Sequence, residues 1–342
     1  MKVLLSGAFG NVGESTLKEL LRKGYDVRCF DLKNPRNSRI RNKLSKHGKF
    51  EVIWGDIRDK ETVNNLVQGV DCIIHLAAII PPLAYERPKL AYEVNVQGTK
   101  NLINAAEKME IPPKFIYSSS IAVHGNTMDK KPPTKIDDPL KPLDYDNYAK
   151  HKIEIEQTLW ASRLPWIILR FAAITPFDMK WDVPDIMFEI PLKQRIEIAD
   201  SRDVGLACSN AVEADIIGKT LFIGGGKGNQ LLQREYVSKM LDVMGIGMLP
   251  EEAFKPVNDI DDFYHCDWME TEESQQILKF QRYTFEDFLN KFKKRKRFMR
   301  FIASMFKPIV RAVLLKKSPY YKKLKEKHHT QQKRRKPKPS FS

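Results

Sequence analysis

The sequence predicts an α/β fold, a doubly wound parallel sheet with helices on both faces. Apolar runs with strand spacing alternate with segments of helical spacing as far as residue 171, the order that builds parallel βαβ units. Glycines follow the first strand, and polar or small residues follow several others. Ligands of such sheets bind beyond the carboxyl ends of the strands, so these residues are the first candidates for a site.

The predicted elements alternate along the first half of the chain. Strands are expected at residues 2–6, 25–30, 50–54, 72–76, 114–118 and 166–171, with helices at 11–23, 60–67, 88–108 and 145–163. After residue 171 the pattern is less regular, and a strand at 219–223 and helices at 232–244 and 284–294 are expected. The glycines at 224–226 lack the lysine and hydroxyl residue of a phosphate loop, so they predict a plain turn.

Three glycines lie between the first strand and the first helix. Gly7, Gly10 and Gly13 are spaced by three, one residue longer than the Gly-x-Gly-x-x-Gly fingerprint of dinucleotide-binding domains. Such a turn lets the backbone approach a pyrophosphate, which rests on the N–H groups and positive end of the helix. Asp31 ends the second strand about 20 residues further on, where a ribose-binding carboxylate is expected. These residues predict a Rossmann-type nucleotide-binding domain.

Tyr148 and Lys152 are four residues apart in a predicted helix, so they share one face. An ammonium beside the phenol favours the ionised form, which brings a tyrosine with an ordinary pKa of about 10 closer to neutral pH. Ser118, Ser119 and Ser120 end the preceding strand, and a hydroxyl there would hold a substrate oxygen. Such a pair alone is common on helix surfaces. Its place after a nucleotide-binding turn favours a proton-transfer site.

The positive charge of the chain is concentrated at its C-terminal end. The whole chain carries +15, whereas residues 291–342 contain 20 Lys and Arg against one acidic residue, which leaves −4 for residues 1–290. Apolar residues at helical spacing lie among these cations between residues 298 and 314. Residues 295–327 therefore predict a basic amphipathic segment for an anionic membrane surface. The alternative is a packed terminal helix with a disordered tail from about Ser318. Nucleic-acid binding is disfavoured because no recognition motif is present.

Bulk properties predict a cytoplasmic protein. We expect no secretory leader, and no uncharged apolar stretch of about 18 residues is present to span a bilayer. The four cysteines are far apart and predict small buried hydrophobes in a reducing compartment rather than a disulfide framework. No metal site is expected, because His328 and His329 have no cysteine or acidic partners nearby in the sequence.

Seven motifs, in order along the chain, resemble those of the extended short-chain dehydrogenase/reductases, also called the NAD-dependent epimerase/dehydratase family. They are residues 6–13, Asp31, residues 55–57, 75–78, 95–99 and 118–125, and Tyr148 with Lys152. The resemblance covers about residues 1–290, is strongest up to Phe171, and leaves the basic tail unexplained.

The resemblance implies a cofactor-binding role for several positions. Asp31 would bind the adenosine ribose and would favour NAD, because the 2′-phosphate of NADP would meet a carboxylate; Lys33 and Arg36 keep NADP open as the less favoured cofactor. The other positions would hold the pyrophosphate (Gly7, Phe9, Gly10, Asn11, Val12 and Gly13), the adenine (Asp56 and Ile57) and the nicotinamide side (Ala77 and Ala78).

The resemblance also implies the catalytic residues. Ser120 would orient the substrate and Tyr148 would act as the acid/base. Lys152 would bind the nicotinamide ribose and lower the pKa of Tyr148. Asn95 is expected to be mainly a structural or proton-relay residue rather than a catalytic one, and Ser118 and Ser119 would replace Ser120 if the register of the loop shifted.

Three departures from the family pattern bear on the substrate. His124 replaces the usual tyrosine and is expected to be a half-buried packing residue. Ile121 and Ala122 stand where sugar-nucleotide 4,6-dehydratases carry Asp-Glu, which argues against a dehydratase. Thr175 replaces a glycine after Arg170, so substrate binding there is expected to be atypical.

The leading hypothesis is an NAD-dependent oxidoreductase or epimerase that transfers hydride at a secondary alcohol or ketone, with nucleotide sugars as one substrate class. The second is a dehydrogenase of a sterol- or lipid-like alcohol at a membrane surface, and the third is a non-catalytic, nucleotide-sensing scaffold. The predicted domains are an NAD-binding domain (1–171), a substrate-binding region interleaved with the last core elements (172–290) and the basic tail (291–342). A homodimer is expected only because dimers are usual in the family.

Overall fold

The structure is a computed structural model that describes residues 1–175 and 183–322. The described chain forms two compact units. Unit 1 contains residues 1–175, 197–230 and 265–285, and unit 2 contains residues 183–196, 231–264 and 286–322. Neither unit is one continuous stretch of chain. The three predicted domains, with boundaries after residues 171 and 290, stay a prediction about function.

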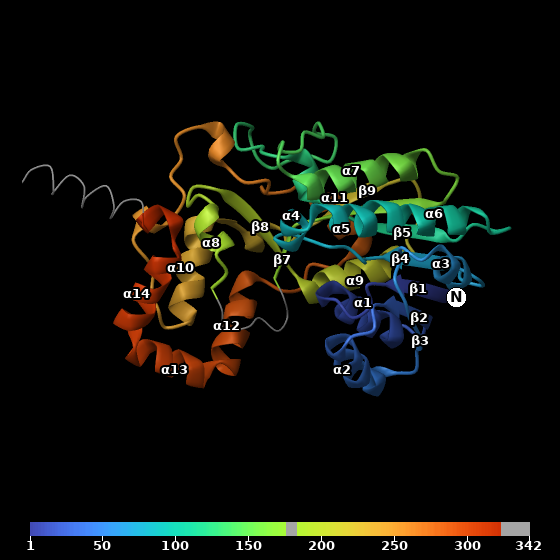
Figure 1. The fold of residues 1–342 in the computed structure, drawn as a ribbon, viewed down its shortest axis with the longest axis horizontal. Helices are drawn as coiled ribbons and strands as arrows, with labels where there is room; N and C mark the ends of the chain where they lie inside the picture. The colour runs from blue at the N-terminus through green and yellow to red at the C-terminus, as the bar shows by residue number, and fades with distance from the viewer. Residues whose placement is uncertain (176–182, 323–342) are drawn as a thin grey trace, which may run out of the picture. The chain divides into compact units, whose positions relative to one another are not determined.

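A seven-stranded parallel sheet forms the centre of unit 1 (Figure 1). The strand order is β3-β2-β1-β4-β5-β6-β9. The strands are β1 (Lys2–Ser6), β2 (Asp26–Asp31), β3 (Glu51–Trp54), β4 (Cys72–His75), β5 (Lys114–Ser120), β6 (Trp166–Phe171) and β9 (Thr220–Ile223). The order runs outward in both directions from β1, so the switch point where dinucleotides bind in such sheets lies between β1 and β4.

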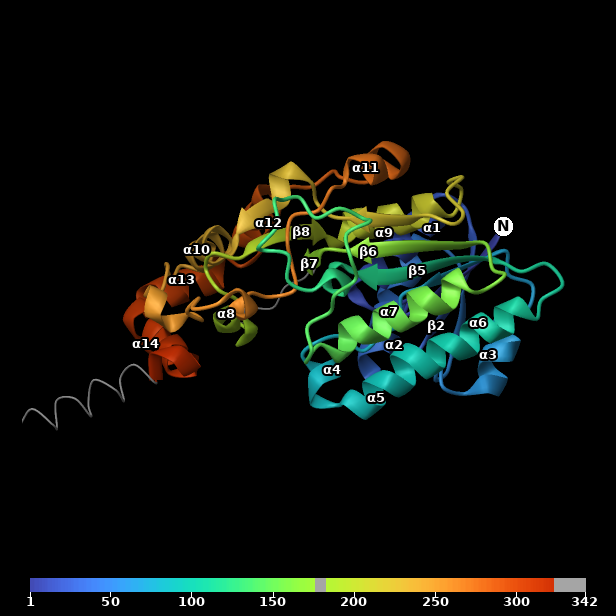
Figure 2. The ribbon, with the colours of Figure 1, turned by 90° about the horizontal axis from the view of Figure 1, so that it is seen from above.

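Helices cover both faces of this sheet (Figure 2). One face carries α1 (Asn11–Arg22) and α9 (Ser201–Ala211), and the other carries α3 (Lys60–Leu66), α6 (Thr99–Glu107) and α7 (Asn147–Trp160). Unit 1 also contains α2 (Pro35–Leu44), α4 (Leu83–Glu86), α5 (Pro88–Tyr92), α11 (Glu272–Leu278) and the short strand β7 (Ala173–Thr175). Short 3₁₀ turns lie at residues 45–47, 121–124 and 227–229.

Apolar side chains of the strands alternate between two clusters, one on each face of the sheet. Val3 and Leu5 of β1 pack with residues of α1 and α9, whereas Leu4 packs with residues of α3, α6 and α7. The α1 and α9 backbones approach closely, because a Cβ on Gly205 would lie 2.6 Å from the Cβ of Ser15. Both faces are therefore buried, as the continuous apolar strands require.

The predicted fold is confirmed, and the differences have local causes. The expected helix at 88–108 is three segments, because a π-helical stretch (Glu93–Gly98) separates α5 from α6. β5 continues as far as Ser120, two residues beyond the prediction. α7 begins only at Asn147, because the Asp146 carboxylate caps it by accepting a hydrogen bond from the Ala149 N–H at 3.0 Å.

Among the helices of unit 1 that escaped sequence prediction, α2 and α9 are the longest. α2 is almost wholly polar, and its start is defined by Asn34, which caps the Asn37 N–H, and by Pro35 in the first turn. α9 is buried on most of its sides, including Asp203 and Cys208, so it lacks the single apolar stripe of a surface helix. The expected glycine turn at 224–226 is present and closes on Glu197, which accepts from the Gly226 N–H at 2.9 Å.

Unit 2 is mainly helical. It contains α8 (Ile186–Glu189), α10 (Gln233–Val243), most of α12 (Phe285–Arg295), α13 (Arg297–Met305) and α14 (Lys307–Lys317), with 3₁₀ turns at residues 251–253 and 260–262. The chain passes between the units within β8 (Arg195–Asp200) and β10 (Gln230–Leu232). These strands and β7 form a second sheet in the order β10-β8-β7.

The basic C-terminal segment forms two helices rather than the single one expected. Pro308 lies in the first turn of α14, where its missing N–H is tolerated, but it cannot continue α13. Disorder from Ser318 is wrong as far as residue 322, because Ser318 is fully buried and its hydroxyl donates to the Ala253 carbonyl at 2.5 Å. Residues 323–327 of the predicted membrane surface, and the tail beyond them, lie outside the described residues. In the described part of the chain, no helix has the length and apolar character needed to cross a membrane.

Candidate active site

The glycine turn lies between β1 and α1 and is pressed against the end of β4. Gly7 has a φ of +68°, and a Cβ there would lie 2.8 Å from the Ala77 backbone nitrogen. A Cβ on Gly13 would lie 2.1 Å from the Gly7 carbonyl oxygen. Both positions therefore exclude a side chain, and the turn stays tight enough for a ligand to approach its backbone.

The amino end of α1 opens onto this turn. Gly10 is the N-cap residue in extended conformation, and it brings no side chain to cap the first N–H groups. Asn11 is exposed and Val12 is half-buried. The Phe9 side chain is fully buried and packs on Trp54 with ring centroids 5.2 Å apart, so only its backbone is available to a ligand. The free N–H groups and the positive helix end fit a pyrophosphate.

Asp31 ends β2 beside the glycine turn. Its carboxylate accepts hydrogen bonds from the Phe9 N–H (2.9 Å), the Leu32 N–H (2.8 Å) and the Asn37 amide (3.0 Å). Burial raises the pKa of Asp31, although these bonds and Arg36 act in the opposite direction. Arg36 Nη1 also donates to the Phe9 carbonyl at 3.2 Å. The carboxylate is thus held at the turn, in a position that fits a ribose hydroxyl pair.

The predicted adenine site follows β3. Asp56 forms an ion pair with Arg58 (2.7 Å between Oδ2 and Nη2), whose guanidinium also contacts Glu93 at 2.8 Å. The hydrogen bonds from Arg58 hold the pKa of Asp56 below its ordinary value. The Ile57 side chain is buried against Gly98, where a Cβ would lie 2.4 Å from it. Ile57 therefore serves packing, and Asp56 presents a charged edge.

A hydrogen-bond chain supports the ends of β1 and β4, where Ala77 and Ala78 lie half-buried. The Ser6 hydroxyl contacts His75 Nδ1 at 2.6 Å, and His75 Nε2 contacts the Thr99 hydroxyl at 2.9 Å. Burial lowers the pKa of His75 to about 3, so its ring is neutral at neutral pH. This chain fixes the turn that follows β4.

Asn95 has the structural role expected of it. Its amide oxygen accepts from the Ile79 N–H at 2.7 Å and its amide nitrogen donates to the Ile79 carbonyl at 2.8 Å. The residue lies in the π-helical segment (Glu93–Gly98), where its side chain is buried. The Asn95 side chain therefore fixes the loop after β4 by binding both the N–H and the carbonyl of Ile79.

Tyr148 and Ser120 meet at the carboxyl end of the sheet. The Ser120 hydroxyl, at the end of β5, lies near enough to the Tyr148 phenol, in the first turn of α7, to act on its pKa, and it accepts a hydrogen bond from the Ala122 N–H at 3.2 Å. Burial raises the pKa of Tyr148, Asp146 adds to that rise, and Ser120 opposes it. In this state the phenol is protonated and is a hydrogen-bond donor at neutral pH.

Lys152 lies one turn further along α7, with its Nζ 5.6 Å from the centre of the Tyr148 ring. The Nζ donates to the Ser118 carbonyl at 2.5 Å and stands over the Tyr117 ring at 4.7 Å. Burial lowers the pKa of Lys152 to about 7. The predicted lowering of the Tyr148 pKa by Lys152 is wrong for this structure, because burial dominates both groups and the ammonium is directed to a carbonyl.

A buried ion pair continues the same face of α7. Glu156 is fully buried and pairs with Arg170 through two bonds, at 3.0 Å and 2.7 Å. The Ser119 hydroxyl donates to Glu156 at 2.5 Å, which removes Ser119 as a substitute for Ser120. Arg170 Nη1 contacts His124 Nε2 at 2.9 Å. Arg170 therefore has a structural role rather than direct access to a substrate.

His124 is more deeply buried than predicted. It is 1% exposed, and burial together with Arg170 lowers its pKa to about 4. A neutral ring that accepts a hydrogen bond from Arg170 fits the packing role expected from the sequence. Thr175 is also buried, and its hydroxyl donates to the Ala199 carbonyl at 3.3 Å, in place of the glycine of the family pattern.

A second buried pair lies at the amino end of α7. Asp146 Oδ2 lies 2.7 Å from His265 Nδ1, and the Tyr85 hydroxyl donates to Asp146 Oδ1 at 3.2 Å. Burial acts to raise the pKa of Asp146, but the bonds from His265, Ala149 and Tyr85 bring it below the ordinary value. Sequence reasoning missed this pair, because no pattern links residue 265 to residue 146. Glu156 was detectable, since it continues the four-residue spacing of Tyr148 and Lys152.

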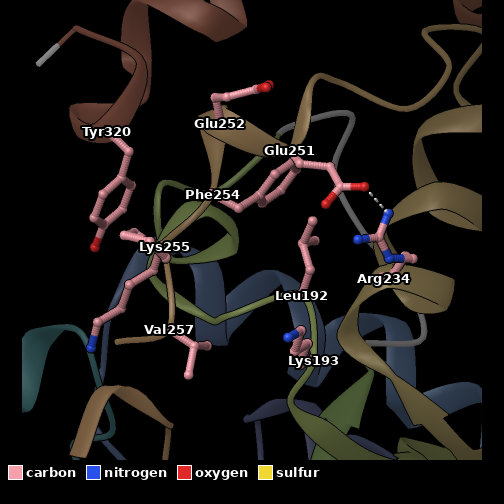
Figure 3. Close-up of a pocket in the computed structure, with 10 residues that line it drawn as sticks. Leu192, Lys193, Arg234, Glu251, Glu252, Phe254, Lys255, Val257 and Tyr320 are labelled. Atoms are coloured by element: carbon pink, nitrogen blue, oxygen red, sulfur yellow. Dashed lines mark hydrogen bonds and ion pairs between the residues drawn. The ribbon is translucent and has the colours of Figure 1, made fainter. Parts of the chain in front are cut away.

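A separate cavity of about 480 Å³ lies within unit 2 (Figure 3). Leu192, Phe254 and Val257 give it apolar walls, and its rim carries the ion pair of Arg234 with Glu251, 2.6 Å apart. None of the predicted site residues lines it.

Metal and disulfide chemistry find no support in the described residues. Within residues 1–175 and 183–322, no group of three His, Cys, Asp or Glu side chains could hold a metal ion. All four cysteines are buried free thiols, as predicted: Cys29, Cys72, Cys208 and Cys266.

The N-terminal half of the chain matches known sequences. Residues 4–163 match the model of the 3-beta hydroxysteroid dehydrogenase/isomerase family. A 3-beta-hydroxysteroid dehydrogenase of Mycolicibacterium neoaurum is 35% identical over 127 residues, 36% of this chain and 32% of that protein. A UDP-glucose 4-epimerase of Lactobacillus helveticus is 29% identical over 183 residues, 52% of each protein. The matched region thus spans a third to a half of these curated relatives.

Solved structures extend the fold likeness over most of the chain. A UDP-glucuronic acid 4-epimerase from Bacillus cereus, solved with UDP-glucuronic acid and NAD, has a TM-score of 0.71 at 20% identity, over 86% of this chain and 99% of that one. The strand order and the glycine turn define the class, an α/β protein with Rossmann topology. Residues 4–163 are thus similar to proteins of the extended short-chain dehydrogenase/reductase type, and the solved structures show the same fold over most of the chain.

Proposed function

We propose that the chain is an NAD-dependent oxidoreductase or epimerase that transfers hydride at a secondary alcohol or ketone, with Ser120, Tyr148 and Lys152 as its catalytic residues. One arrangement carries the proposal: Ser120 lies near enough to the Tyr148 phenol to act on its pKa, and Lys152 lies one turn further along the same helix, with its Nζ 5.6 Å from the centre of the Tyr148 ring. A carbonyl oxygen placed between the two hydroxyls would be held and polarised by both.

The protonated phenol sets the direction of the first proton transfer. Because burial raises its pKa, Tyr148 is suited to donate a proton to a ketone oxygen. A reduced nicotinamide supplies hydride to the carbonyl carbon when it is bound. The ketone thus gains one hydride at carbon and one proton at oxygen. In the opposite direction the Tyr148 phenolate accepts the alcohol proton.

NAD is the proposed cofactor, and NADP is the less favoured one. The tight backbone at Gly7 and Gly13 and the uncapped end of α1 support pyrophosphate binding. Asp31 supports NAD, since its carboxylate lies where a 2′-phosphate would be repelled. Arg36 lies beside the Phe9 carbonyl and is the residue through which NADP would be tolerated.

Two substrate classes have support from relatives. The epimerase relatives favour a nucleotide sugar. The matching family model and the dehydrogenase relatives favour a sterol- or lipid-like alcohol, which would suit a protein attached to a membrane surface. A non-catalytic, nucleotide-sensing scaffold is the third candidate, and the presence of Ser120, Tyr148 and Lys152 together counts against it.

Tyr148→Phe tests the proposal with a matched control. It should lower kcat/KM by about 10²–10⁴-fold while NAD binding, followed by calorimetry, stays within about twofold. Tyr25→Phe makes the same change at the amino end of β2 and should leave turnover unchanged. The substrate panel would contain UDP-hexoses and 3β-hydroxysteroids, assayed by nicotinamide absorbance or by epimer analysis. No turnover on either class, with NAD still bound, would favour the sensing scaffold.

A further inference from the structure

The helices α13 and α14 expose an apolar face. Its members are Phe298, Phe301, Met305, Phe306, Ile309 and Val313, called the apolar face below. Phe298 is 73% exposed, Phe301 66% and Ile309 62%. A helix of a water-soluble protein normally turns such a stripe toward the core. Here the stripe is on the solvent side of both helices.

The opposite side of these helices is held within unit 2 by hydrogen bonds and by buried apolar side chains. Arg311 Nη1 donates to three successive carbonyls, those of Ile246 (3.2 Å), Gly247 (2.9 Å) and Met248 (2.6 Å). Ala303 and Leu314 are buried. The helices are therefore held with a cation inward and aromatic rings outward, the reverse of the expected packing of a terminal helix.

The segment that carries the apolar face is rich in cations. Residues 291–322 contain 12 Lys and Arg and no Asp or Glu. Exposed members lie at the end of α12, among them Lys293 and Lys294, and at the end of α14, Lys316 and Lys317. The segment thus combines exposed large apolar side chains with exposed lysines that come before and after them in the sequence, of which Lys317 also lies 3.7 Å from the Asp185 carboxylate.

We propose that the apolar face binds the surface of an anionic lipid membrane, with its aromatic and aliphatic side chains in the acyl boundary and the flanking lysines at the phosphate level. An anionic membrane fits both the apolar side chains and the lysines of this segment. For a helix at a membrane surface, the free energy from buried apolar area and that from attraction to anionic lipid both contribute to binding. A second copy of the chain would bring one basic segment against another, which like-charge repulsion opposes.

The proposal goes beyond the hydride-transfer reaction and does not depend on it. Large surface-exposed apolar patches mark interaction sites. Membrane docking would also place the chain beside a lipid-phase alcohol, should that substrate class prove correct. Its experimental test uses no nicotinamide cofactor, so a failure of either proposal is separately visible.

Vesicle co-sedimentation of the full chain tests the surface. We expect binding to vesicles of phosphatidylcholine with phosphatidylserine, weak binding to phosphatidylcholine alone, and loss of most binding at 1 M salt, where the Debye length falls to about 3 Å. The triple variant Phe298→Ser, Phe301→Ser, Ile309→Ser should lower the partition coefficient at least about 100-fold. The control Ile111→Ser, Ile217→Ser removes two exposed apolar side chains of unit 1 and should bind like the parent chain.

The charge is tested separately by Lys293→Gln, Lys294→Gln, Lys316→Gln, which should weaken binding to anionic vesicles and reduce its salt dependence. Thermal unfolding of each variant, followed by circular dichroism, shows that the fold is kept. Equal vesicle binding by the triple variant and the parent would overturn the proposal. So would absence of vesicle binding by the parent together with a dimer that the triple variant abolishes, since that result assigns the face to a second copy.

Discussion

The acid/base residues of the candidate site are governed first by burial. Tyr148 and Lys152 are the predicted pair, yet the pKa of the first is raised and that of the second is lowered to about 7, so burial disfavours the charge on both. The Lys152 Nζ is directed to the Ser118 carbonyl. In this state the site holds a neutral, donating phenol beside a lysine that titrates near neutral pH.

The lowered pKa of Lys152 predicts a pH dependence of stability. Between pH 7 and 10.5 the unfolded chain carries a proton on Lys152 that the folded chain lacks, so the free energy of unfolding rises with pH in this window. The rise is at most about 1.4 kcal/mol per pH unit. Denaturant unfolding of Lys152→Met against the parent should show a smaller rise in the variant. Lys150→Met, an exposed position of the same helix, should follow the parent. Identical slopes for all three proteins would contradict the buried, deprotonating lysine.

Asp31 predicts the cofactor preference. Asp31→Ala should lower affinity for NAD and shift the ratio of NAD to NADP affinity toward NADP by about tenfold, because the carboxylate that repels a 2′-phosphate is removed while Arg36 stays. The comparison is Asp26→Ala, at the exposed start of the same strand, which should not shift the ratio. Titration of each variant with both cofactors measures it, and an unchanged ratio would remove Asp31 from the ribose site.

At the scale of single residues, the sequence motifs indicate which residues are candidates for the site, but they do not show the burial and charged neighbours that set the pKa values of those residues. Ser120 and Tyr148 were predicted from an ordered pattern, and their catalytic roles stay a prediction; in the structure Ser120 lies near enough to Tyr148 to oppose the rise of its pKa. The charges around them depend on contacts distant in sequence, such as Asp146 with His265. A pKa follows from desolvation and neighbours in space, so no local pattern carries it.

At the scale of elements, α7 organises the site. Tyr148, Lys152 and Glu156 follow one another at four-residue spacing, and their partners come from the end of β5 and from β6. The first turn of the helix thus carries the proposed proton-transfer residue, and the third turn anchors the helix to the sheet.

The anchor can be measured by substitution. Glu156→Gln breaks a buried ion pair and should destabilise the fold by about 3–5 kcal/mol, because the Arg170 charge would be left buried without its counter-charge. Glu154→Gln, on the same helix, breaks the partly exposed pair with Lys100 and should cost about 0–1 kcal/mol. Urea unfolding of both variants gives the comparison. Similar, small losses would show that the buried pair contributes little to stability.

Strongly patterned elements were predictable and weakly patterned ones were not. The strands of the parallel sheet and α1 were predicted to within one or two residues, since apolar periodicity reports burial on one or both faces. α2 has no apolar stripe, and α9 consists mostly of small and polar residues that are nevertheless buried. Neither helix therefore shows the apolar periodicity by which a helix is predicted. The π-helical segment was missed because one extra residue in a turn leaves the helical pattern almost intact.

At the scale of the whole molecule, charge and core are separated along the sequence. The apolar clusters belong to unit 1, whereas the excess of positive charge belongs to the C-terminal segment. Composition revealed that segment, but only the structure showed which side of its helices is exposed, because periodicity defines a stripe without saying what the stripe faces.

The sheet order predicts a gradient of local stability. β4 is the central strand, with three strands on each side, and β1 has two strands on one side and four on the other, whereas β3 and β9 end the sheet. Native-state hydrogen exchange should therefore be slowest at amides of β1 and β4 and faster at β3 and β9, whose pairing can open without disturbing the centre. Mass-spectrometric exchange on the full chain would show it. Uniform exchange across the seven strands would indicate that the sheet opens only as a whole.

The interleaving of the two units has a consequence during synthesis. β6 is complete at residue 171, but its outer neighbour β9 is made only at residues 220–223, after a segment of unit 2 has left the ribosome. Until then the six strands already made leave β6 as an unpaired edge. The Asp146 carboxylate that caps α7 also lacks its partner, because His265 has not yet been synthesised. A nascent chain stalled before residue 220 is therefore expected to hold an unfinished sheet, the kind of intermediate that chaperones recognise.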